Sequence, residues 1–133
     1  MILKQNVAVK AIVTEEFRTD LLAKLRGATK EVELGINQLE QQGQRYLLGL
    51  DRQNIQQMLS VRQEIEEEKK KQELLKSQFA EKIKEVEGLS LGQEYPQGTL
   101  EGFVEITLGD DLGRKLAGQE VVIKDGIVIE IRS

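Results

Sequence analysis

The chain has 133 residues and a formal charge of −4, from 19 basic and 23 acidic side chains. It contains no histidine, no cysteine and no tryptophan. These absences exclude disulfide bonds, thiol nucleophiles, an imidazole base and the usual nitrogen and sulfur ligands of zinc. The length suits one domain, or a small domain with an appendage.

The first segment, residues 2–13, alternates apolar and polar side chains. Its apolar positions are Val7, Val9, Ala11 and Val13. Alternation of β-branched residues predicts a half-buried strand. Thr14 follows as a helix N-cap, with Glu15 and Glu16 in the first helical turn, where the helix dipole favours acidic groups.

From Thr14 to about Gly88, apolar residues recur at steps of three, four or seven, as in a coiled coil. They include Phe17, Leu21, Leu25, Leu39, Tyr46, Met58, Ile65, Phe79, Ile83 and Val86. One straight helix would hold the two ends of the chain more than about 100 Å apart, at ~1.5 Å per residue. Neither terminal segment could then bury its apolar side chains, so an antiparallel hairpin is favoured.

The turn of this hairpin is expected near residues 49–54, where Asp51 or Asn54 can cap a new helix. Folding the chain back near residue 52 sets apolar residues opposite one another along both arms. Leu39 then meets Ile65, and each arm is roughly 50 Å long.

The C-terminal part begins with a linker at 89–93 and continues with a predicted strand at 98–108. A short helix follows, with Asp110 as its N-cap and Gly118 as its end. The last two strands, 121–123 and 127–131, are joined by residues 124–126. We expect a three-residue loop with Gly126 in the left-handed conformation, because this loop pairs Ile123 with Ile127 and Val121 with Ile129.

Residues 1–13 and 94–133 together give a marginal core for a unit standing alone. The first strand must therefore join the C-terminal strands. The predicted fold is α+β: a small antiparallel β domain built from the N-terminal strand and the C-terminal strands, with an inserted long antiparallel α-helical (coiled-coil) hairpin at 14–93.

Three stretches carry a resemblance to a known family: VAVKAIVTEEF at the front, EGFVEITLGDDL, and VVIKDGIVIEIR at the end. With the charged helical middle between them, the chain resembles the YlqD family of bacterial proteins. The resemblance implies a cytosolic bacterial protein. It brings no activity, cofactor or catalytic residue that could be transferred to this chain.

Carboxylates are the only abundant groups that could carry chemistry. Glu64 and Glu68 share one helix face and could hold a hard cation, but a solvated helix face with Glu–Lys pairs explains them as well. Asp110 and Asp111 are adjacent, so a helix cap beside a first-turn acid is the simpler interpretation. We predict no catalytic residue, no cofactor and no metal site, and hence no enzyme.

The expected hairpin tip is unusually apolar. Tyr46, Leu47, Leu48 and Leu50 end the first arm, and Ile55, Met58 and Leu59 open the second. Two facing helices bury one stripe, here expected at Tyr46 and Met58, which leaves Leu47, Leu50 and Leu59 on flanking surface. A local core that closes the turn is the alternative. The candidate interaction residues are Tyr46, Leu47, Leu50, Ile55 and Leu59, where a tip would meet a second tip or a partner.

The main functional interpretation is a non-enzymatic interaction or scaffold protein that forms a homo-oligomer and binds a further protein. A ribosome- or RNA-associated accessory protein and a holdase-type chaperone are the alternatives. Basic residues are not concentrated in either part of the chain, so nucleic acid is a weaker candidate partner. Lys4 and Lys10 are a local exception, which protection of an edge strand would equally explain. No window resembles a signal peptide or a membrane span, so a cytoplasmic location is expected.

Overall fold

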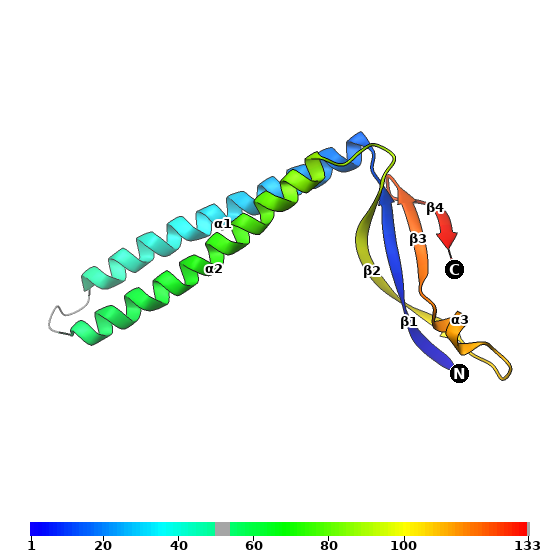
Figure 1. The fold of residues 1–133 in the computed structure, drawn as a ribbon. Helices are drawn as coiled ribbons and strands as arrows, with labels where there is room; N and C mark the ends of the chain where they lie inside the picture. The colour runs from blue at the N-terminus through cyan, green and yellow to red at the C-terminus, as the bar shows by residue number, and fades with distance from the viewer. Residues whose placement is uncertain (50–53, 133) are drawn as a thin grey trace. The chain divides into compact units, whose positions relative to one another are not determined.

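The structure is a computed structural model that describes residues 1–49 and 54–132. The described chain divides into two compact units. The β unit comprises residues 1–19 and 89–132, and the hairpin unit comprises residues 20–88 (Figure 1). The elements in chain order are β1 (Ile2–Ile12), α1 (Glu15–Gly49), α2 (Ile55–Glu87), β2 (Glu94–Glu105), α3 (Leu112–Leu116), β3 (Gln119–Lys124) and β4 (Ile127–Arg132).

The β unit contains a four-stranded sheet in the order β2-β1-β3-β4 (Figure 1). The first strand joins the C-terminal strands, as expected, and it lies between β2 and β3. Edge protection does not explain Lys10, because β1 is paired with β3 at this position, and Lys10 forms an ion pair with Glu120 at 3.0 Å.

The sheet is mixed, whereas a wholly antiparallel one was expected. β1 pairs antiparallel with β2 and β3 pairs antiparallel with β4, but β1 and β3 are parallel. The physical reason lies in the connection between β2 and β3. β2 ends beside the start of β1, where Glu105 pairs with Ile2, and α3 has only five residues. The connection of residues 106–118 brings the chain to the middle of β1, where β3 starts opposite Val7 and then runs in the same direction as β1.

The turn between β3 and β4 contains two residues, so the expected three-residue loop is wrong. Asp125 and Gly126 both have positive φ, at 49° and 83°, which is the pattern of a type I′ hairpin turn. Ile123 pairs with Val128, and a bulge then shifts the register. The bulge restores an apolar pair further along the strands, where Val121 lies opposite Ile131. The change of register therefore occurs inside the strand rather than in the turn.

The pairing registers give the sheet two faces of opposite character. The charged face carries Lys4, Lys10, Glu94, Glu101, Glu105, Glu120, Lys124, Glu130 and Arg132. The apolar face carries Leu3, Val7, Val9, Ala11, Tyr95, Leu100, Val104, Val121, Ile123, Val128 and Ile131, together with Gln5, Gln119, Gly98 and Gly102. Side chains alternate between faces along a strand, so this division follows directly from the sequence pattern.

Three helix starts are capped by side chains. The Oγ1 of Thr14 accepts a hydrogen bond from the backbone N–H of Phe17, as predicted for an N-cap. Asn54 caps α2 in the same way, with its side chain accepting from the N–H of Gln57. Asp111, rather than the expected Asp110, caps α3.

The hairpin unit holds α1 and α2 side by side as an antiparallel pair (Figure 1). Its buried residues are Val32, Ile36, Gly43 and Val86, spaced along the two helices at the steps of a coiled-coil seam.

The register between the two arms differs from the expected one by about one helical turn. Ile65 lies against Gly43, where an added Cβ atom would be 2.6 Å from the Ile65 Cδ1 atom, whereas the expected partner was Leu39, one turn earlier. Two ion pairs between the arms agree with this register: Lys69 with Glu40 at 2.8 Å, and Lys76 with Glu33 at 3.4 Å. An apolar seam repeats every three or four residues, so a shift of one turn keeps apolar residues opposite each other.

Candidate interaction surfaces

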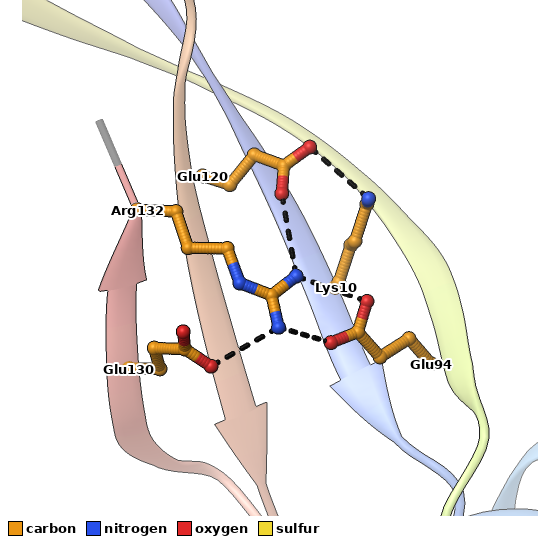
Figure 2. A network of polar contacts seen from close by, with 5 residues as sticks. All are labelled: Lys10, Glu94, Glu120, Glu130 and Arg132. Atoms are coloured by element: carbon orange, nitrogen blue, oxygen red, sulfur yellow. Dashed lines mark hydrogen bonds and ion pairs between the residues drawn. The ribbon is translucent and has the colours of Figure 1, made fainter.

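The charged face of the sheet contains a network of ion pairs that involves all four strands (Figure 2). Its centre is the guanidinium of Arg132, on β4. This group donates two hydrogen bonds to the carboxylate of Glu94, one of them 3.1 Å long, and a further bond of 3.0 Å to Glu130. Glu120 lies 3.6 Å from Arg132 and also pairs with Lys10.

The network changes the pKa values of Glu94 and Arg132. The hydrogen bonds from Arg132 lower the pKa of Glu94, because they favour the ionised carboxylate. The same bonds, to Glu94 first and Glu130 second, raise the pKa of Arg132. The Glu94 carboxylate and the Arg132 guanidinium therefore each favour the charged form of the other.

The network also covers an apolar residue. Val122, in the middle of β3, pairs with Lys10 on one side and Glu130 on the other, and only 1% of its surface is exposed. The aliphatic parts of long charged side chains can cover apolar surface while their ends stay in water. On this face Val122 is thus deeply buried, whereas Ile2, Phe103 and Ile127 stay exposed.

Asp110 and Asp111, singled out in the sequence, accept local hydrogen bonds. Asp110 accepts hydrogen bonds from the backbone N–H and the hydroxyl of Thr107, and these bonds lower its pKa. Asp111 accepts from the N–H of Arg114 as a helix cap. Within residues 1–49 and 54–132, no three acidic side chains gather closely enough to hold a metal ion, and this includes the surroundings of Glu64 and Glu68.

The hairpin tip presents apolar side chains to solvent, in the residues that the structure describes. Tyr46, Leu48, Ile55 and Leu59 are exposed, and Leu47 and Met58 are half-buried. The fifth candidate from the sequence, Leu50, lies outside the described residues.

Two hollows lie beside these tip residues. The first, of about 340 Å³, is lined by Ile55, Met58, Leu59 and Arg62. The second, of about 490 Å³, includes Leu47 and Arg62 in its lining and extends to the Glu40–Lys69 ion pair. Leu47 of α1 and Leu59 of α2 therefore belong to separate hollows that share Arg62, and the structure does not bring all the tip candidates into one pocket.

The charge at the tip differs from that of the chain. The described residues 44–49 and 54–63 contain two charged side chains, Arg45 and Arg62, and both are basic. The whole chain has a formal charge of −4. The tip is therefore an apolar and weakly basic surface on an acidic protein.

The apolar face of the sheet is a candidate surface that sequence reasoning missed. Its edge residues Leu100, Val128 and Ile131 are exposed, and Val7 and Val9 on the inner strand are only partly covered. The signal was present in the sequence, because this face contains no charged position and no helical segment of the small β domain is long enough to cover it. The alternation of apolar and polar residues predicted that this face is buried, but it did not say which element would cover it.

Regarding membranes, none of the described helices is both long enough and apolar enough to span a bilayer.

Comparison with known proteins agrees with this architecture. A curated relative, "Uncharacterized protein YlqD" of Bacillus subtilis (strain 168), is 32% identical over 127 residues, which cover 96% of this chain and 94% of the relative. A crystal structure of a protein of unknown function from Synechococcus sp. WH 8102 has the same fold, with a TM-score of 0.88 and 24% identity. That match covers 100% of this chain and 95% of the other.

The family model described as YlqD protein matches residues 1–132. This match covers the sheet, both arms of the hairpin and the terminal strand with its KDGIVIEIR segment. The chain belongs to the YlqD family.

Proposed function

We propose that this protein is a non-enzymatic binding protein whose hairpin tip engages another protein. The observation that carries the proposal is the group of exposed apolar side chains at the tip, Tyr46, Leu48, Ile55 and Leu59. Exposed apolar residues scattered singly are ordinary, but four of them within residues 46–59 favour an interaction site.

The chemistry of the tip favours an amphipathic helix with acidic flanks as the partner. The hollow beside Ile55 and Leu59 is lined by apolar side chains and one guanidinium, that of Arg62. A helix can lay an apolar face into such a hollow, and an acidic residue at its edge would pair with Arg62 or Arg45. Arginine is well suited to this role because its planar group binds a carboxylate through two hydrogen bonds.

RNA fits this surface less well. Binding to a phosphate backbone depends on several basic side chains acting together, and the described part of the tip has only Arg45 and Arg62. The exposed groups of the tip are also mostly aliphatic, whereas RNA bases stack on aromatic side chains. A ribosomal or RNA partner therefore becomes an outcome of the test, as does a holdase activity towards unfolded chains.

Site-specific photocrosslinking in cells tests the proposal. A photoreactive phenylalanine replaces Tyr46, which is exposed at the tip, and a matched chain carries it at Leu34, which is exposed in the middle of α1. We expect the Tyr46 position to yield a discrete protein adduct that the Leu34 position does not yield. The crosslinked peptide should be an amphipathic helix with acidic residues.

The double change Leu47→Glu with Leu59→Glu should abolish this adduct, because it places carboxylates in both hollows of the tip. Circular dichroism should show an unchanged helical content, since neither side chain is fully buried. An adduct with RNA, an adduct of twice the mass of the chain, a smear of many unfolded clients, or equal adducts at both positions would each overturn the proposal.

A further inference from the structure

We infer that the apolar face of the β unit binds the same face of a second copy of this chain, so that two sheets form a two-layer sandwich. The inference concerns a different surface from the tip and does not depend on the function proposed for the tip. It rests on the composition of the face, its size, and the shapes of its two edges.

The composition of the face is that of an interior. None of its sheet positions carries a charged side chain, whereas the opposite face carries nine. Its buried polar residue, Gln5, donates a hydrogen bond of 3.1 Å to the backbone carbonyl of Ala117. Covering the face therefore buries no unpaired charge. The amide of Gln5 keeps its hydrogen bond to Ala117.

The two ends of the face are already covered within the β unit. At one end, the ring of Phe17 lies 6.0 Å from that of Tyr95, and only 7% of Tyr95 is exposed. At the other end, Gln5 meets the segment that follows α3. Between these ends, the edge residues Leu100, Val128 and Ile131 stay exposed. The uncovered region is thus the middle of the face, bounded by the protein's own elements.

The size of the face suits a weak but specific dimer. Four strands spaced ~4.8 Å apart, over about six residues of ~3.3 Å each, give roughly 400 Å² per copy, and the longer β1 and β2 add to this. Specific interfaces of standard size bury about 800 Å² per partner. The apolar face reaches about half of that area, as in weak and transient complexes, so a dissociation constant no tighter than micromolar is expected.

The shapes of the two edges favour a second copy over an unrelated partner. At one edge, β2 has Gly98 and Gly102 on this face, which leaves recesses on either side of Leu100. At the other edge, β4 presents Val128 and Ile131 as a ridge. A two-fold axis that runs along the strands places the β4 ridge of one copy over the β2 recesses of the other, and the reverse. Aligned packing of this kind is usual between two sheets.

The tip is left for a different occupant. Two separate two-fold interfaces on one chain would build a dihedral tetramer or an open-ended filament instead of a dimer. Assigning the sheet face to a second copy and the tip to another protein gives a closed dimer with two free tips.

Sedimentation velocity on the full-length chain, from about 1 to 200 µM, tests the inference across the expected dissociation constant. The key variant is Ile131→Glu, on the apolar face of β4. Its matched control is Ile127→Glu, because Ile127 lies on the same strand with 69% exposure against 70% for Ile131, but on the charged face. We expect wild type and Ile127→Glu to dimerise, and Ile131→Glu to remain monomeric with at least tenfold weaker association.

Crosslinking tests the arrangement, since the natural chain has no cysteine. A mixture of Leu100→Cys and Ile131→Cys chains, treated with a short thiol-to-thiol crosslinker, should give more dimer than either chain alone. Circular dichroism checks that each variant keeps its sheet. A wild type that stays monomeric up to 200 µM, equal effects of the two isoleucine changes, or no preference for the mixed pair would each overturn the inference.

Discussion

The hairpin unit and the β unit both have a small core, but they are stabilised in different ways. In the hairpin, two long helices share a narrow seam, and charged side chains reach across it, as in the Lys69–Glu40 and Lys76–Glu33 pairs. In the β unit, a strand from the N-terminus lies between two strands from the C-terminus. The hairpin is thus stabilised by neighbours along a repeating seam, and the sheet by contacts between distant parts of the chain.

This difference determines how strongly one substitution affects the stability of each unit. A seam repeats, so the loss of one contact leaves the next turn intact, and a shifted register costs little. A sheet face does not repeat in this way, because a slip of one residue moves every side chain to the opposite face. We therefore expect the sheet to unfold as a whole and the hairpin to lose structure locally.

The largest effect is expected from removal of residues 1–13. This deletion takes away β1, which pairs with both β2 and β3. What remains is a lone strand and a two-stranded hairpin, and such a hairpin is marginally stable in water at best. The β signal in circular dichroism and its thermal transition should disappear, while helical signal from α1 and α2 remains. An unchanged β signal and melting temperature would contradict the contrast.

Within the hairpin, Ile36→Asp should destabilise the unit by about 3 kcal/mol, because it buries an unpaired carboxylate in the seam. Ile36 is 7% exposed, whereas Leu34, two residues earlier on the same helix, is 61% exposed. Leu34→Asp is thus the matched control, with an expected change within about 0.5 kcal/mol. Thermal unfolding followed by helical circular dichroism measures both. Equal effects would mean that the seam is not where the structure puts it.

The same contrast explains how much of the fold could be predicted from the sequence. The kind of each element, and the pairing of the first strand with the last ones, followed from periodicity and from the need to bury apolar surface. The parallel pairing of β1 and β3 did not, because it depends on the path of the connection between β2 and β3, which periodicity does not determine. The turn at Asp125 and Gly126 was misassigned because a bulge, which no pattern in the sequence marks, corrects the register afterwards.

The candidate site was predicted in part. Clustering of apolar residues near the turn placed Leu59 on the flanking surface, where it is exposed, but the expected burial of Tyr46 in the stripe is wrong, because Tyr46 is exposed as well. The register of the hairpin could not be predicted, because a seam with apolar residues at every third or fourth position accepts more than one alignment. Charge pairs such as Lys69–Glu40 contain that information, but many similar pairings can be drawn between two charged helices.

A smaller effect distinguishes the two registers of the hairpin. In an exposed helix, changing glycine to alanine stabilises by roughly 1 kcal/mol. Gly27→Ala should show this gain, because an added Cβ meets nothing within 4 Å. Gly43→Ala should show little or no gain, because its Cβ would lie 2.6 Å from the Cδ1 atom of Ile65, which must then rotate. Equal increases in melting temperature for the two variants would contradict this register and support the one in which Leu39 faces Ile65.

The smallest expected effect concerns acid on the charged face of the sheet. The hydrogen bonds from Arg132 lower the pKa of Glu94 from its ordinary value of 4.5. A carboxylate whose pKa is lower in the folded state contributes stability above its ordinary pKa and loses this contribution as the pH falls through the folded value. Glu94→Gln should therefore lower the melting temperature at about pH 7, and the difference from wild type should shrink below about pH 4.5.

The matched control for this measurement is Glu101→Gln, on the same strand and the same face but outside the Arg132 network. Its effect should be smaller than that of Glu94→Gln near neutral pH. The size of the Glu94 effect is limited because about a third of the side chain is exposed to solvent, where water and salt weaken the ion pair. If the two changes follow the same curve with pH, the network covers Val122 by packing alone, and its charges add nothing to the stability of the sheet.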